Sequence, residues 1–359
     1  MKKNLILVAA AMAIPSVAFA DVNLTFDTNP GKLTVIELNV ASGEELRSEL
    51  TVDDATLKAV HPIASKEAAR VVFLKEGQRS PVADLYVQGP ADNVVVTIKD
   101  GKASYSGTAL MEGIGAVKDV VASFNERFRK VMQGESNEDG NAVEAEYYAA
   151  IKGMIAANPQ SLTTPYAVLM LDGDDFMEAY NALDAAQKEG YFKPMLEKQK
   201  ASVEKKMRIE QLYRDLESGV KPAPSFSLPN PDGKMVTLED FRGKWVILDF
   251  WGSWCGWCIK GIPELKEAYK KYEGKLEVIG IDCRDDREDW LEAIKEYELP
   301  WVHVYNDTDN VEATPDRVDQ AYGIQGFPTK IIVDPEGKVK KIVVGEDPSF
   351  YEILADYLK

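Results

Sequence analysis

The two cysteines whose spacing can support chemistry are Cys255 and Cys258, which are separated by Gly256 and Trp257. They follow an apolar segment, residues 245–250, that predicts a buried strand, and they open a segment that predicts a helix. At the start of a helix, two thiols at this spacing can close a disulfide without rebuilding the backbone. The pattern predicts a redox-active pair.

The expected helix start gives the two sulfur atoms different roles. The partial positive charge and unpaired N–H groups of a helix N-terminus stabilise a thiolate, and this lowers the pKa of a thiol placed there. Cys255 is therefore the expected nucleophile. Cys258 lies one turn further into the helix, so we expect it to be less exposed and to resolve a mixed disulfide by attacking Cys255.

The segments around this pair alternate between strand and helix. Residues 276–281 and 330–333 predict further strands, and residues 288–297 predict a helix between them. Alternation of this kind indicates an α/β sheet. Two prolines, Pro222 and Pro224, form a stiff boundary before the block. We assign residues 219–359 to one α/β domain.

These motifs resemble the thioredoxin-like family. Residues 249–258, DFWGSWCGWC, are similar to the family's active-site segment, and Pro263 follows the second cysteine as in the family's helix. Residues 326–329, GFPT, resemble the loop whose proline is cis and packs against the disulfide. More narrowly, APSF at 223–226 and the stretch from GK at 233 to FRGK at 241–244 resemble the exported TlpA and ResA subfamily.

The resemblance implies a central mixed sheet with helices on both faces and thiol-disulfide oxidoreductase activity without a metal or organic cofactor. It implies that Asp249 is a buried acid that moves the proton of Cys258, because burial raises a carboxyl pKa toward neutrality. An exposed acid at a strand end is the other interpretation of Asp249. The resemblance also implies a cis peptide before Pro328, which places the backbone of Phe327 beside the disulfide to pair with a substrate strand.

Aromatic residues around the cysteines are the expected substrate contacts. By the same resemblance, Trp254 covers the disulfide as an apolar platform, and Trp257 and Phe327 complete the substrate-binding set. The residues alone leave open whether Trp251 or Trp254 instead belongs to the core.

The direction of electron flow depends on the reduction potential of the Cys255–Cys258 pair, which the motif alone does not give. Thioredoxins commonly have proline where this chain has Trp257, and the dipeptide between the cysteines influences the reduction potential. Exported TlpA-like proteins are mostly reductants fed by a membrane electron donor, so we favour a reductase of disulfides in exported client proteins. A disulfide oxidant or isomerase is one alternative. A binding or assembly protein that carries a redox module is another.

Other chemistries of cysteine fit the sequence less well. Peroxiredoxins share the fold, but Gly252 occupies the position of the threonine in their P-x-x-x-T-x-x-C pattern. A zinc site built from the redox pair with Cys283 and His303 has suitable ligand types, yet the pair lies in a redox segment. Haem attachment needs histidine where Ile259 stands. Cys283 itself is expected to be a small, partly buried residue at a strand end, and intermolecular pairing or a regulatory thiol are the alternatives.

The first twenty residues predict a secretory signal peptide. Lys2 and Lys3 precede an apolar run, and residues 18–20, AFA, form an A-x-A cleavage site. Removing two of the 42 basic residues leaves 40 − 59 = −19 for the mature chain. No later stretch approaches the ~20 apolar residues of a membrane span, so we expect a soluble protein of the periplasm or cell envelope.

Composition sets limits on the rest of the chain. The formal charge of −17 over 359 residues, without a basic tract, argues against nucleic-acid binding. Residues 21–115 predict a small antiparallel β domain, similar to the DUF4369 domain of Bacteroidetes envelope proteins, with strands at 33–38, 70–74, 82–87 and 94–98. Residues 116–218 predict a helical segment that includes helices at 174–186 and 195–216. A homodimer is one arrangement that the sequence leaves open.

Overall fold

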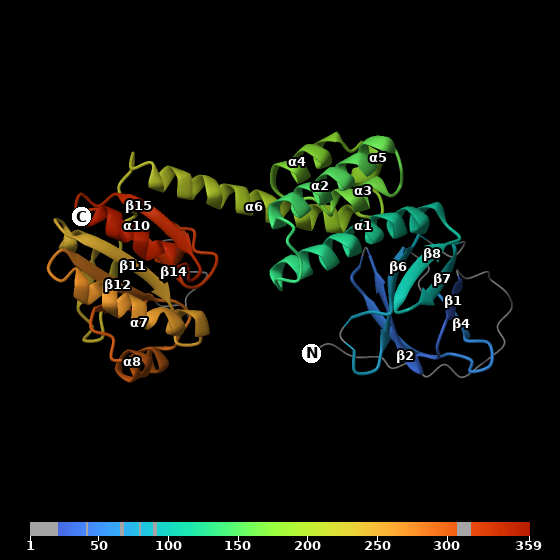
Figure 1. The fold of residues 1–359 in the computed structure, drawn as a ribbon, viewed down its shortest axis with the longest axis horizontal. Helices are drawn as coiled ribbons and strands as arrows, with labels where there is room; N and C mark the ends of the chain where they lie inside the picture. Colours follow the sequence, from blue (N-terminus) through green and yellow to red (C-terminus); the bar gives the residue numbers. More distant parts are fainter. Residues whose placement is uncertain (1–20, 41, 65–67, 79, 89–91, 307–316) are drawn as a thin grey trace. The chain divides into compact units, whose positions relative to one another are not determined.

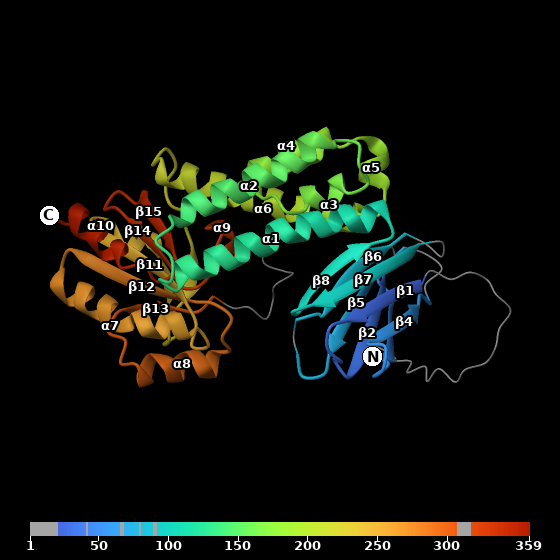
Figure 2. The same ribbon diagram turned by 45° about the vertical axis from the view of Figure 1, so that its right-hand side comes forward.

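The chain forms two compact units in a computed structural model that describes residues 21–359, except 41, 65–67, 79, 89–91 and 307–316. The units are Met1–Glu204 and Lys205–Lys359. Figures 1 and 2 show the elements of each. The predicted signal peptide, residues 1–20, lies outside the described residues.

The first unit begins with two four-stranded sheets. One has the order β4 (Lys58–Pro62), β1 (Asp21–Phe26), β7 (Asn93–Lys99), β8 (Lys102–Ser106). The other has the order β3 (Glu45–Thr51), β2 (Lys32–Asn39), β5 (Ala69–Lys75), β6 (Ala83–Val87). Neighbouring strands run antiparallel, as predicted, except for the parallel pair β1 and β7. Burial alternates along β1 and β2, because each sheet has one face on the core.

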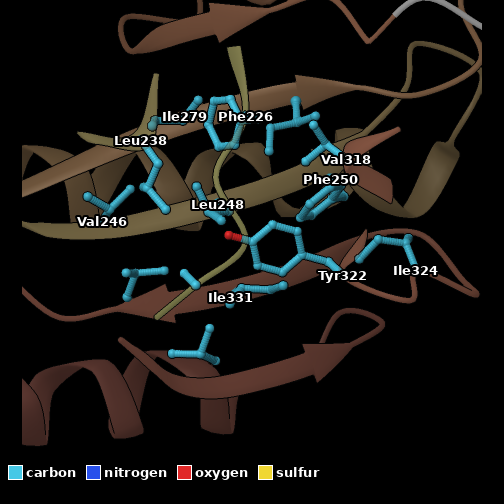
Figure 3. Packing of buried hydrophobic residues seen from close by; sticks show 14 of the residues in the cluster. Phe226, Leu238, Val246, Leu248, Phe250, Ile279, Val318, Tyr322, Ile324 and Ile331 are labelled. Carbon is cyan, nitrogen blue, oxygen red and sulfur yellow. The ribbon is translucent and has the colours of Figure 1, made fainter. Parts of the chain in front are cut away.

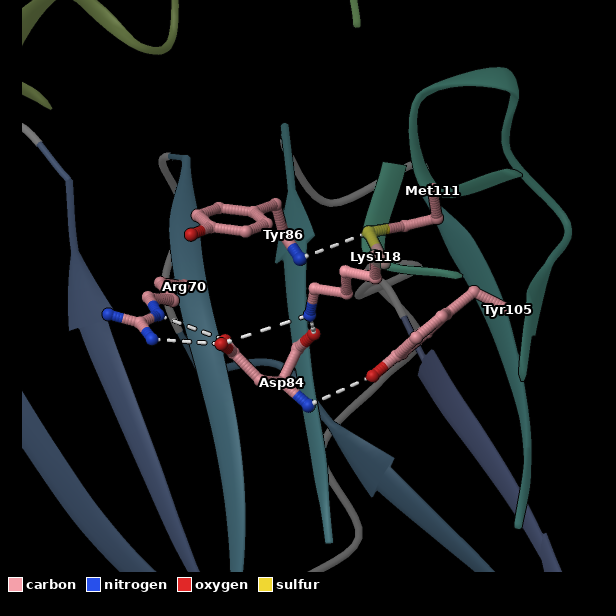
Figure 4. A network of polar contacts seen from close by, with 6 residues as sticks. All are labelled: Arg70, Asp84, Tyr86, Tyr105, Met111 and Lys118. Carbon is pink, nitrogen blue, oxygen red and sulfur yellow. Dashed lines mark hydrogen bonds and ion pairs between the residues drawn. The ribbon is translucent and has the colours of Figure 1, made fainter. Parts of the chain in front are cut away.

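A polar network connects the strands to the first helix of this unit (Figure 4). The Arg70 guanidinium donates two hydrogen bonds to the Asp84 carboxylate, at 2.9 and 2.8 Å. The Lys118 ammonium lies 3.8 Å from the same carboxylate and also donates to the Asp84 carbonyl. The Asp84 backbone N–H donates to the Tyr105 hydroxyl at 3.2 Å. One residue of β6 thus bonds to β5, β8 and α1.

Helices make up the rest of the first unit. They are α1 (Ala109–Met132), α2 (Gly140–Ala157), α3 (Thr164–Val168), α4 (Gly173–Ala182), α5 (Ala185–Glu189) and α6 (Lys193–Glu217), which continues into the second unit. The prediction of one helix over 174–186 is wrong, because Leu183 is extended and Asp184 starts α5 with a capping box closed by Gln187.

The second unit contains a mixed five-stranded sheet, as predicted. Its order is β13 (Val302–Val304), β12 (Leu276–Asp282), β11 (Trp245–Trp251), β14 (Thr329–Val333), β15 (Val339–Val344). The first three strands are parallel, and β14 and β15 are antiparallel to their neighbours. The remaining elements are β9 (Ser227–Pro229), β10 (Met235–Thr237), η1 (Leu238–Phe241), α7 (Gly256–Lys271), α8 (Arg287–Glu296), α9 (Val318–Ala321) and α10 (Ser349–Tyr357).

Buried side chains cover both faces of this sheet, and alternate side chains of β11 belong to the two apolar clusters on these faces. Leu248 and Phe250 pack with Tyr322 in one apolar cluster (Figure 3). Ile247 and Trp251 pack in a second cluster with buried side chains of α7, α8 and α10. Because side chains alternate along a strand, Asp249 belongs to the face that α7 covers. The strand thus brings a carboxyl group under the helix that carries the two cysteines.

Candidate functional site

Cys255 and Cys258 form a disulfide at the N-terminus of α7, with their Cα atoms 5.3 Å apart. Cys255 is the N-cap residue of the helix, and its sulfur accepts a hydrogen bond from the backbone N–H of Cys258 at 3.2 Å. The sulfur thus takes the place of the usual N-cap oxygen. A thiolate at Cys255 would accept the same hydrogen bond and face the positive end of the helix.

Both cysteines are nearly buried, and each is 6% exposed. The prediction that Cys258 is the less exposed of the two is therefore wrong for the disulfide form. The reason is geometric, since the S–S bond holds both sulfur atoms at the same helical turn.

The segment that joins β11 to α7 is held by the strand-end loop after β12. Ser253 donates from its backbone N–H and its hydroxyl to the Asp285 carboxylate, both at 2.8 Å. The Trp254 indole N–H donates to the Cys283 carbonyl at 3.0 Å. A Cβ on Gly252 would lie 2.5 Å from the Trp254 indole nitrogen, so only glycine fits there. Sequence reasoning missed Asp285, although an acidic run marked the loop.

The GFPT loop completes the surroundings of the disulfide. The peptide between Phe327 and Pro328 is cis, as the resemblance predicts. Phe327 packs against the apolar cluster that contains both cysteines, and its ring lies edge-on to Trp254 with the centroids 5.3 Å apart. The structure therefore brings Trp254, Phe327 and the disulfide together.

Two tryptophans beside the disulfide are exposed, which is unusual for such large apolar side chains. Trp254 is 49% exposed and Trp257 is 62% exposed, whereas Trp251 is a core residue at 2%. Of the two candidates for the core, Trp251 is the correct one. Cations lie over the exposed rings: Arg284 is 5.9 Å from the ring centroid of Trp254, and Lys260 is 4.7 Å from that of Trp257.

Asp249 is buried in the sheet under α7, with 8% exposure. Its Oδ1 atom finds no hydrogen-bond partner among the residues that the structure describes. Burial raises the pKa of Asp249 from 3.8 to about 6, the charge of Lys330 lowers it, and that of Glu346 raises it. The exposed acid considered as an alternative is therefore wrong. A carboxyl group with this pKa exchanges protons near neutral pH.

Two charged residues near Asp249 were missed by sequence reasoning. Lys330 and Glu346 form an ion pair of 2.6 Å, with side chains only 4% and 12% exposed. The lysine within the apolar sequence of β14 could have indicated a buried charge. Glu346 lies in the loop after β15, where an acidic residue is common and indicates nothing.

Cys283 and His303 do not join the disulfide site. The thiol of Cys283 is fully buried, packs in the cluster on the opposite face of the sheet, and has its pKa raised by burial. Burial lowers the pKa of His303 to about 4, so it is a neutral core histidine. Over the described part of the chain, no three His, Cys, Asp or Glu side chains are grouped as metal ligands would be.

Comparisons with known proteins agree with this geometry. The model of the AhpC/TSA family matches residues 220–342. The thiol-disulfide oxidoreductase ResA of Bacillus thuringiensis subsp. konkukian is 34% identical over 140 residues, which are 39% of this chain and 76% of that protein. The chain belongs to the ResA-like thiol-disulfide oxidoreductases. The match to the family model lies entirely within the second unit, which carries the disulfide.

Further relatives share this part of the chain. The thioredoxin-like protein YneN of Bacillus subtilis is 28% identical over 140 residues, or 38% of this chain and 79% of that protein. Among solved structures, the thioredoxin domain of a thiol-disulfide oxidoreductase from Bacteroides vulgatus is 33% identical, with a TM-score of 0.35, and covers 39% of this chain and 96% of that domain. Within the described residues, no helix is both long and apolar enough to cross a membrane.

The raised pKa of Asp249 predicts a pH-dependent stability. The folded carboxyl binds its proton more tightly than the unfolded one, so its contribution is complete below pH 3.8 and is lost as the pH rises through about 6. A shift of about two units corresponds to about 3 kcal/mol. From pH 4 to pH 8, the second unit should lose about this much unfolding free energy relative to an Asp249→Asn variant.

Urea denaturation monitored by tryptophan fluorescence measures the unfolding free energy of the second unit, because all six tryptophans lie between residues 245 and 301. The exposed Glu273→Gln is the matched control and should keep the pH dependence of the wild type. Parallel stability curves for Asp249→Asn and the wild type would contradict the assignment.

Proposed function

We propose that the protein reduces disulfides of exported client proteins through the dithiol form of Cys255 and Cys258. The observation that carries the proposal is the position of the Cys255 sulfur as the N-cap acceptor of α7. This position favours the thiolate, which is the nucleophile in thiol-disulfide exchange. The peptide before the cis Pro328 and the buried Asp249 are the proposed docking edge and proton acceptor.

The first step is attack on the client. The Cys255 thiolate attacks one sulfur of the client disulfide, the client S–S bond breaks, and the departing client thiolate takes a proton from water. A mixed disulfide between Cys255 and the client remains. One sulfur of the client is then a free thiol, and the other is bonded to Cys255.

The second step releases the client. The Cys258 thiol gives its proton to the Asp249 carboxylate, and the new thiolate attacks the Cys255 sulfur. The mixed disulfide breaks, the second client thiolate leaves and takes a proton from water, and the Cys255–Cys258 disulfide forms, while Asp249 keeps the proton of Cys258 until the pair is reduced again. Two electrons have passed from the enzyme to the client. A dithiol donor, which we propose to be a membrane protein, must reduce the pair again.

The client is proposed to bind at the surface around the disulfide. We assign the backbone of Phe327, beside the cis Pro328, to pairing with an extended client segment. The exposed rings of Trp254 and Trp257 give that segment an apolar platform. No bond chemistry is assigned to these residues.

The reaction is proposed to take place outside the cytoplasm, because residues 1–20 have the charge, apolar run and A-x-A site of a signal peptide. We propose a β domain over 21–115, similar to DUF4369, a helical segment over 116–218 and the redox domain over 219–359. The absence of the peroxiredoxin threonine at Gly252 counts against peroxide reduction, and the Trp254 indole and the Cys283 carbonyl leave little room for a side chain there.

A Cys255→Ser variant should lose reduction of insulin disulfides, because the nucleophilic sulfur is gone. The measurement is the rate of insulin reduction by the pre-reduced protein. Cys283→Ser is the matched control, since that thiol is buried on the other face of the sheet, and it should keep the rate. Wild-type rates for Cys255→Ser would remove Cys255 from the mechanism.

A Cys258→Ser variant should accumulate mixed disulfides with clients, because the step that releases them is blocked. Non-reducing electrophoresis of cell-envelope extracts should show high-mass bands that collapse on reduction. The double variant Cys255→Ser/Cys258→Ser is the control and should form none. A well-expressed Cys258→Ser protein without such bands would argue against protein clients.

The reduction potential of the Cys255–Cys258 pair decides the direction of electron flow. We expect a value below about −250 mV, typical of a reductant, whereas a value near −120 mV is typical of an oxidant. Equilibration with glutathione or dithiothreitol buffers, followed by alkylation of free thiols, gives the potential. A value at the oxidising end would replace the reductase proposal with the alternative of a disulfide oxidant or isomerase.

A further inference from the structure

Lys330 is a charged residue within a buried strand. It is 3% exposed, and its neighbours Ile331 and Ile332 are fully buried. In the register of β11 and β14 it stands directly opposite Asp249. Directly opposed residues of antiparallel strands have Cβ atoms about 5 Å apart on the same face. Asp249 is therefore an available counter-ion for the Lys330 ammonium.

Lys330 instead pairs with Glu346. The Lys330 ammonium lies 2.6 Å from a Glu346 carboxylate oxygen. The same carboxylate packs against α7, where a Cβ on Gly261 would lie 2.3 Å from it. Gly261 follows Cys258 by three residues, so the missing side chain leaves room for the Glu346 carboxylate close to the resolving cysteine. Asp249 keeps an oxygen without a partner among the described residues.

We propose that Glu346 and Lys330 are positioning residues for the proton transfer at Cys258: Glu346 holds the Lys330 ammonium in an ion pair, so that Asp249 remains a carboxyl group able to exchange its proton. The inference rests on the proposed role of Asp249 as proton acceptor. If Lys330 paired with Asp249, the carboxylate would be fixed in its charged form and would be a weak base.

The charges around Asp249 agree with this division. The charge of Lys330 lowers the pKa of Asp249, and the charge of Glu346 raises it, so the effects of the two charges on this pKa have opposite signs. From α10, Tyr351 faces the same group with a buried hydroxyl that has no partner among the described residues, and its pKa is raised by burial and by Glu346, Asp249 and Glu264 of α7. From β12, the residue opposite Asp249 is Gly280, which does not titrate.

A purely structural ion pair would make a different prediction. If Lys330 and Glu346 only fastened β14 to the loop after β15, removing Glu346 would change the pKa of Asp249 through the loss of its own charge alone, and the change would be the same with and without Lys330. If Glu346 acts by holding the Lys330 ammonium, the change on removing Glu346 depends on the presence of Lys330. This dependence separates the two roles.

The test compares Glu346→Gln with Lys330→Met in the full chain. In Glu346→Gln the ammonium is left with Asp249 as its counter-ion, so the pKa of Asp249 should fall by about one unit or more, the usual effect of an opposite charge within about 4–6 Å. In Lys330→Met the cation is gone, and the pKa should rise. Infrared or carbon-13 NMR titration of the oxidised protein measures the carboxyl directly, with Asp249→Asn to identify its signal.

The pH profile of insulin reduction provides the functional readout, and its acidic limb should move in the same direction as the pKa of each variant. Glu217→Gln and Lys341→Met are matched controls, because these residues form a 3.2 Å ion pair that is 29–38% exposed and involves the neighbouring strand. Both controls should leave the carboxyl titration unchanged.

The double variant Lys330→Met/Glu346→Gln tests whether Glu346 acts through Lys330. Without the lysine, removal of Glu346 should shift the pKa of Asp249 less than it does in the wild type. An equal shift in both backgrounds, no shift, or a rise in Glu346→Gln would overturn the inference. Should Lys330→Met fail to fold, Lys330→Gln replaces it in the single and the double variant. The titration needs no turnover, so an inactive wild type would refute the proposed function and not this inference.

Discussion

A carboxyl group in the middle of an apolar sheet is the constraint around which the second unit is built. An isolated buried charge costs several kcal/mol, so the group stays where a proton or a nearby cation can offset that cost. Here Asp249 stands on β11 with buried strands on both sides and α7 above it. The same strand ends at the segment that carries Cys255. The position of the acid and the position of the proposed nucleophile, Cys255, therefore depend on the same strand register.

The loops at the strand ends complete the arrangement with directed hydrogen bonds. Asp285 binds Ser253, and the Cys283 carbonyl binds the Trp254 indole, so the segment before the disulfide is fixed on its polar side. Phe327, which precedes the cis Pro328, packs edge-on against the Trp254 ring. Rigid support of this kind keeps reacting groups at a set separation, which an exposed loop would not do.

Local patterns in the sequence were sufficient for the central strands, because residues 245–250 and 276–281 are mostly apolar and the C-x-x-C pair opens a helix. The strand β3 was missed, because its sequence ELRSELT is mostly polar and it is held as a strand by its hydrogen-bonded pairing with β2. The Lys330–Glu346 pair was missed for a related reason. The β14–β15 hairpin brings these two residues together, so their spacing in the sequence does not predict the ion pair.

The N-cap hydrogen bond to Cys255 has a consequence for turnover. A thiolate, a mixed disulfide and an internal disulfide each keep lone pairs on the Cys255 sulfur, so the backbone N–H of Cys258 has an acceptor in all three states. The first turn of α7 need not fray and re-form while the sulfur exchanges partners. In the proposed reaction, reorganisation between states is then confined to side chains and the client, as a preorganised site requires.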